Sequence, residues 1–89
     1  MERLRAADDA AGTTQAPLDA AQKKAIADAR QRATARLAER EILFKDAMRK
    51  TDDPAEREKA ENEYQIDTKR INEDRDREIE RIRSRSRTR

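Results

Sequence analysis

The chain has 89 residues, of which 47% are charged, 34% are hydrophobic and 2% are aromatic. So few apolar side chains in so short a chain exclude a large hydrophobic core, and we predict one small domain at most. The chain has neither cysteine nor histidine. This excludes disulfides and removes the commonest zinc ligands and the usual nucleophile-and-base pairs. We therefore predict no catalytic residue, no metal, no cofactor and no small-molecule substrate, and we do not expect an enzyme.

Mixed charges with few aromatic residues are also typical of disordered chains. The many Ala, Glu, Arg and Lys residues, the single glycine and the periodic Ile and Leu positions favour long helices over residues 18–82 instead. No apolar run approaches the roughly 20 residues needed to span a bilayer, and no apolar signal core follows Met1. We expect a cytoplasmic protein without a membrane partner.

The first predicted helix spans residues 17–50. Residues 1–16 include Gly12 and show little periodicity, so we predict a flexible N-terminal arm there. Pro17 and Asp19 mark the helix start, because proline fits the first helical position and an acidic residue suits the positive end of the helix dipole. Arg49 and Lys50 suit its negative end.

The strongest helix break is the segment Thr51-Asp52-Asp53-Pro54. Asp53 can cap a new helix that begins at Pro54, and Glu56 completes the spacing of a capping box. We therefore predict a turn over 51–53 and a second helix over 54–82. The alternative is one continuous helix through Pro54 in a parallel coiled coil, but a proline inside a helix costs about 3 kcal/mol.

Each predicted helix carries one narrow apolar face at a rotation of roughly 100° per residue. Steps of eleven residues, such as Ile26 to Leu37 and Ile71 to Ile82, predict a nearly straight or slightly right-handed helix pair. The predicted hairpin seam consists of Ile26, Ala33, Leu37, Phe44, Tyr64, Ile71 and Ile82.

Folding the chain back at residues 51–53 brings these two faces together, with Ala33 opposite Ile71 and Arg40 opposite Tyr64. The predicted fold is therefore all-α, a coiled-coil-like antiparallel two-helix hairpin. Because its seam is imperfectly apolar, we expect it to dimerise into a four-helix bundle.

Three aliphatic residues lie away from the predicted seam, namely Ile42, Leu43 and Ile66. Scattered surface aliphatics are normal in soluble proteins. The thin seam favours a second interpretation, in which they form a protein interface. The chain would then be a structural or regulatory interaction protein that self-associates as a homodimer or higher oligomer, or docks as a small accessory subunit on a larger assembly.

Acidic and basic residues interleave along the second helix, and their spacing predicts ion pairs within the helix rather than a cation site. The C-terminus differs, because residues 81–89 hold five arginines and no acid. The candidate polyanion-binding residues are Arg81, Arg83, Arg85, Arg87 and Arg89. We predict a basic tail over 83–89 that acts as a solubilising end, binds an acidic protein groove or, as the alternative function, binds nucleic acid phosphates.

Overall fold

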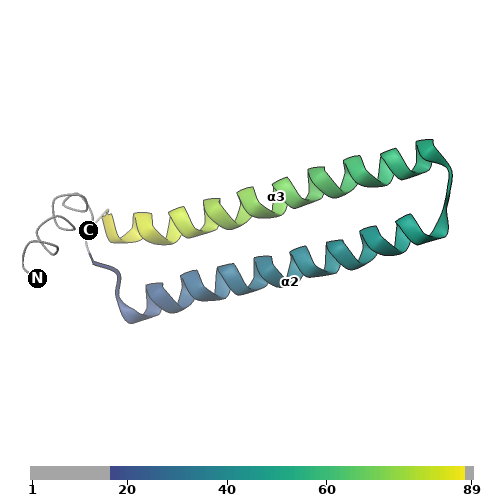
Figure 1. Cartoon of the computed structure of the whole chain (residues 1–89). Coiled ribbons are helices and arrows are strands. Elements are labelled where there is room, and N and C mark those ends of the chain that lie inside the picture. The colour runs from purple at the N-terminus through teal and green to yellow at the C-terminus, as the bar shows by residue number, and fades with distance from the viewer. Residues whose placement is uncertain (1–16, 88–89) are drawn as a thin grey trace, which may run out of the picture.

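The computed structural model describes residues 17–87, which form two antiparallel helices joined by a short turn (Figure 1). Helix α2 is Ala20–Lys50 and helix α3 is Pro54–Arg87. The predicted all-α fold, with two helices packed against each other, is confirmed for these residues, among which no strand occurs. The molecule measures 59 × 25 × 20 Å, so it is a rod whose turn lies at one end.

Helix α2 begins at Ala20, three residues after Pro17, because Asp19 forms its N-cap. The Asp19 carboxylate accepts a hydrogen bond from the Gln22 N–H at 2.7 Å, and the Asp19 N–H donates to the Gln22 side chain at 3.1 Å. This reciprocal capping box satisfies two N–H groups at the start of the helix. Gln22 Nε2 also donates to the Ile82 carbonyl at 3.0 Å, which ties the start of α2 to the last turns of α3.

The turn is held differently from the capping box predicted for Asp53 and Glu56. The Asp53 N–H donates to the Thr51 hydroxyl at 3.1 Å, and that hydroxyl donates to the Glu56 carboxylate at 2.6 Å. The Arg57 guanidinium donates to the carbonyls of Met48 and Thr51 at 2.8 and 3.0 Å. Carbonyls at a helix end lack intrahelical partners, so the first turn of α3 satisfies the end of α2.

Helix α3 continues to Arg87, past the predicted end at residue 82. No glycine or proline follows Pro54, and arginine is a favourable helix former, so nothing in the local sequence stops the helix at Ile82. Residues 83–87 of the predicted tail are therefore helical. The predicted arm over 1–16 and residues 88–89 lie outside the described residues.

The core between the helices is small and consists of residues that are 3–6% exposed. Its members are Ile26, Ala29, Ala33, Ile71 and Ile82. Four of them belong to the predicted seam, and Ala29 adds a second small residue on α2. Leu37, Phe44 and Tyr64 are only partly buried. The seam residues are therefore most deeply buried in the half of the hairpin that lies away from the turn.

Cross-helix contacts near the turn add to the predicted pairing. Tyr64 stacks on Phe44, with ring centroids 4.5 Å apart and planes 18° apart, and lines the same groove as Arg40. Arg40 pairs with the carboxylate of Asp67. Both contacts stabilise the alignment of the helices, because stacking buries two large rings together and a guanidinium gains a charge-assisted hydrogen bond.

Ala33 tests the packing of the two helices, because its small side chain is 4% exposed at the seam. We expect Ala33→Leu to lower the free energy of unfolding by about 1–3 kcal/mol through overpacking, as measured by urea unfolding followed by circular dichroism. The matched control is Ala35→Leu, which places the same side chain on the exposed face of α2 and should be nearly neutral. Equal effects of both substitutions would contradict this packing.

Candidate functional site

Three large aliphatic side chains remain exposed on the hairpin: Ile42 is 67% exposed, Leu43 49% and Ile66 56%. They lie at one level along the rod. The Phe44–Tyr64 stack marks one side of this level and the Arg40–Asp67 ion pair marks the other, and all three residues fall between these two contacts in sequence. We call Ile42, Leu43 and Ile66 the aliphatic belt.

The members of the belt point in different directions around the rod. Leu43 lines a groove of about 210 Å³ between the helices, where Ala47, Ala60 and Tyr64 are among its neighbours. Ile66 lies on the outer side of α3, beside Arg70 and other charged residues. Ile42 precedes Leu43 by one residue, a rotation of about 100° around the helix, which turns it away from that groove. One flat partner surface therefore cannot cover all three side chains.

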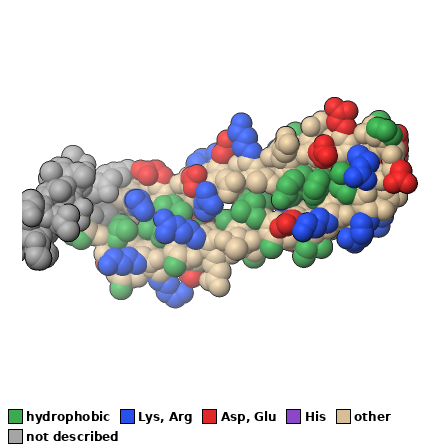
Figure 2. Space-filling view, viewed as in Figure 1, with side chains coloured by type: hydrophobic (Ala, Val, Ile, Leu, Met, Phe, Trp, Pro, Cys, Tyr) green, Lys and Arg blue, Asp and Glu red, His purple; other side chains and the backbone are tan. Residues whose placement is uncertain are grey.

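The apolar surface is discontinuous on the face of the rod that Figure 2 shows. Figure 2 shows green hydrophobic side chains in separate groups, with blue and red charged side chains between them. The view agrees with the small buried core and with the cross-helix ion pairs Arg32–Glu78 and Arg40–Asp67. Charges thus reach the seam itself, which reduces the apolar area available to hold the helices together.

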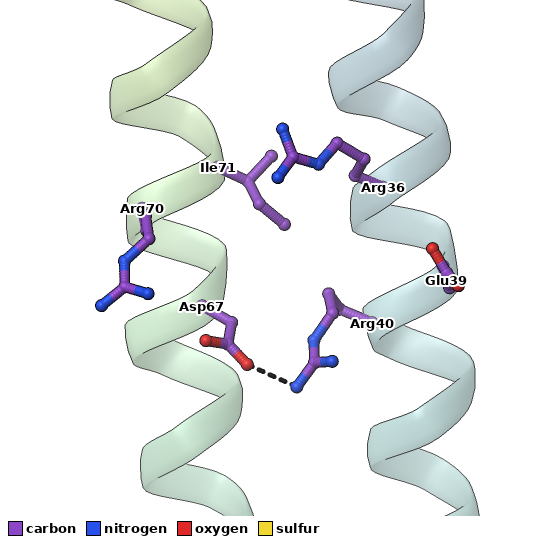
Figure 3. Close-up of a pocket in the computed structure, with 6 residues that line it drawn as sticks. All are labelled: Arg36, Glu39, Arg40, Asp67, Arg70 and Ile71. Carbon is purple, nitrogen blue, oxygen red and sulfur yellow. Dashed lines mark hydrogen bonds and ion pairs between the residues drawn. The ribbon is translucent and has the colours of Figure 1, made fainter.

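The middle of the seam is polar (Figure 3). Arg40 and Asp67 point towards each other across a hollow of about 300 Å³, while Arg36 extends across it towards Ile71. The side chains of Arg40 and Asp67 are 38% and 30% exposed, yet Arg40 Nε and Thr68 Oγ1 are buried without a hydrogen-bond partner. Unpaired buried polar atoms cost free energy, so this level weakens the hairpin.

Charges at the end of α2 form a local network. Asp46 accepts contacts from Lys50 at 2.7 Å and from Arg49 at 2.9 Å. The hydrogen bond from Lys50 is the main cause that lowers the pKa of Asp46 below its ordinary value, with further contributions from the charges of both basic residues. All of these groups are at the surface, where such pairs add little stability. The network is a solvated helix end rather than a reactive site.

Helical geometry divides the candidate polyanion-binding arginines. Arg81 and Arg85 are exposed and lie one helical turn apart, hence on the same side of α3. Arg83 is half-buried on another side, and its Nε is buried without a partner. Arg87 ends the helix, and Arg89 lies outside the described residues. Arg81, Arg83 and Arg85 therefore do not form one continuous basic face.

The described residues contain no group of three or more potential metal ligands of the His, Cys, Asp or Glu type. Over the same residues, neither helix is long and apolar enough to cross a membrane. Comparisons with protein-family models, with curated proteins and with solved structures found no match to this chain.

Sequence reasoning missed two residues that hold the site in place. The spacing of charges predicts ion pairs within the second helix for both Arg57 and Asp67. Arg57 instead donates to two carbonyls and fixes the turn, and Asp67 pairs with Arg40 across the seam. The position of Arg57, four residues after Asp53, was the sequence signal for its role at the turn, because it places the guanidinium within the first turn of α3.

Replacing the Arg40–Asp67 pair tests the weakness of the seam. We expect Arg40→Met/Asp67→Leu to raise the free energy of unfolding by about 1 kcal/mol, because apolar packing replaces partly buried charges. Asp67→Leu alone should lower it, because Arg40 then loses its partner. The matched control is Arg32→Met/Glu78→Leu at the more exposed cross-helix pair, where a smaller change is expected. Urea unfolding at low protein concentration would measure all three, and a destabilised Arg40/Asp67 double variant would refute the interpretation.

Proposed function

We propose that this chain is a non-enzymatic structural or regulatory interaction protein, whose helical hairpin self-associates or docks as a small accessory subunit on a larger assembly. The observation that supports this proposal is the aliphatic belt. Three large aliphatic side chains are 49–67% exposed in a hairpin whose buried core has only five residues, two of them alanines.

The physical case rests on the imbalance between buried and exposed apolar surface. Fully burying an Ile or Leu side chain contributes about 1.5–3 kcal/mol, and the three belt side chains are still 49–67% exposed, so roughly half of that free energy per side chain remains unused. Because the three side chains point in different directions, each partner surface that covers members of the belt would recover part of this free energy. A second hairpin is the smallest such partner, and two hairpins together make the four-helix arrangement that commonly buries helices of this length.

The belt is tested by Ile42→Lys/Ile66→Lys. Two lysines would place charges in the proposed interface, so sedimentation equilibrium should show loss of association. The helical signal in circular dichroism should stay close to that of the parent chain, because both positions lie outside the seam. The control variant Thr34→Lys/Gln65→Lys adds the same charge at two other exposed positions, and it should associate like the parent chain.

Two results would count against the proposed interface. Unchanged association of the Ile42/Ile66 variant would show that the belt is not the contact surface. Loss of helicity in that variant, with retained helicity in the Thr34/Gln65 control, would assign Ile42 and Ile66 to the fold rather than to an interface.

A second candidate function is binding of nucleic acid phosphates at the end of α3. It is favoured by Arg81 and Arg85, which are exposed on one side of the helix in a segment that has no acid after Glu80. Arginine binds phosphate through bidentate hydrogen bonds and long-range attraction. A dimer would present two such ends and gain avidity from two weak contacts.

Deletion of residues 83–89 tests this second function. Fluorescence anisotropy with a labelled single-stranded oligonucleotide should show binding that weakens between 50 and 200 mM salt in the parent chain and is lost in the truncated chain. A control chain carries four lysines changed to glutamine on the helical body, at Lys23, Lys24, Lys45 and Lys69, and keeps the arginine segment. Equal affinity of the parent and truncated chains would exclude the segment as the binding site.

A further inference from the structure

A row of alternating charges runs along the outer side of α3 and is centred on Ile66. Its members are separated by three or four residues, so they lie on one side of the helix. All of them are exposed. The charge row comprises Glu56, Lys59 and Glu63 before Ile66, and Arg70, Glu73 and Arg77 after it.

The order of signs in the charge row is antisymmetric about Ile66. Before Ile66 the row reads acidic, basic, acidic, and after it the row reads basic, acidic, basic. Ion pairing within a single helix favours simple alternation, and simple alternation through the position of Ile66 would place an acid at position 70. The structure has Arg70 there. The alternation of acidic and basic residues is therefore shifted by one step at Ile66.

A row with this order of signs is complementary in charge to a second copy of itself that runs in the opposite direction. If two copies of α3 lie antiparallel with Ile66 against Ile66, Lys59 of each copy meets Glu73 of the other, because both lie seven residues from the centre. Glu63 meets Arg70, and Glu56 meets Arg77, each with an offset of one residue, or about 1.5 Å. In a parallel pair, every charge would face its own like.

The same comparison fails on α2. Around Leu43, an antiparallel pair would bring Glu39 near Asp46 and Arg36 near Lys50, which places like charges together. The complementarity is thus confined to α3. Within residues 17–87, no ion pair involves Lys59, Glu63, Arg70 or Glu73. Four of the six charges of the row are therefore available to a partner.

We propose that a second copy of this chain docks antiparallel along the outer side of α3, with the two-fold axis at Ile66 and the charge row setting the orientation. The inference rests on the proposed self-association and specifies its geometry. Ile66 supplies the apolar centre, and the six charges select the antiparallel partner over the parallel one. Ile42 lies on the other helix and is not part of this contact.

A charge swap tests the pairing of Lys59 with Glu73. Glu73→Lys should raise the dimer dissociation constant about tenfold at low salt in sedimentation equilibrium, because two attractive contacts per dimer become repulsive. Adding Lys59→Glu to that variant should restore the affinity. The matched control is Glu61→Lys, an identical substitution on another side of α3, which should leave the dissociation constant unchanged.

Orientation is measured separately by single spin labels, since the chain has no native cysteine. Labels on Ala55→Cys and on Asn62→Cys, each alone, occupy exposed positions eleven and four residues from Ile66. The antiparallel dimer predicts axial separations between identical labels of about 33 Å and about 12 Å, whereas a parallel dimer predicts no axial separation for either. Pulsed electron paramagnetic resonance distinguishes the two.

The outcomes separate this inference from the proposed function. Rescue by the swap together with unequal label distances supports the antiparallel α3 contact. Association without rescue, or with equal label distances, overturns the contact and leaves self-association standing. A parent chain that is monomeric across the concentration series overturns the contact and self-association together, leaving only docking on another protein.

Discussion

The packing of α2 against α3 along one narrow seam is the contact on which the rest of the structure depends. Neither helix contacts any other element within residues 17–87. Isolated helices gain little stability in water beyond their own hydrogen bonds, because most helical stability in proteins comes from packing of an apolar face. The core that supplies this packing has three isoleucines and two alanines. Loss of the seam would therefore remove the main support of both helices at once.

The polar level at Arg40 and Asp67 favours one register of the two highly charged helices. A uniformly apolar seam would tolerate sliding of one helix along the other, whereas a cross-helix ion pair next to the Phe44–Tyr64 stack is satisfied at only one offset. The cost is the buried, unpaired Arg40 Nε. We interpret this level as one that lowers the stability of the hairpin but fixes the alignment of its two helices. The aliphatic belt lies on the outer surface at the same level.

The periodicity of the sequence was sufficient to predict two helices, the break at residues 51–53 and the packing of the helices against each other. Rotation at about 100° per residue also identified the side of each helix that holds Ile26, Ala33, Ile71 and Ile82. It could not predict the side-chain contacts that fix the axial offset, because the same faces meet in any register. That offset depends on the packing of Phe44 with Tyr64 and on the hydrogen bonds of Arg57 in the turn. These contacts join residues that are distant in sequence, or they depend on one side-chain conformation.

The small core would link folding to the association that we propose, even though the belt lies outside the seam. A partner that binds only the folded hairpin stabilises it in proportion to the logarithm of partner concentration, so helicity and association rise together when the isolated fold is marginal. The separate location of the belt has a further consequence. Ile42, Leu43 and Ile66 are exposed without any opening of the seam, so docking requires no rearrangement of the core. On the proposed function, the hairpin presents its contact surface as soon as it folds and becomes more stable once that surface is covered.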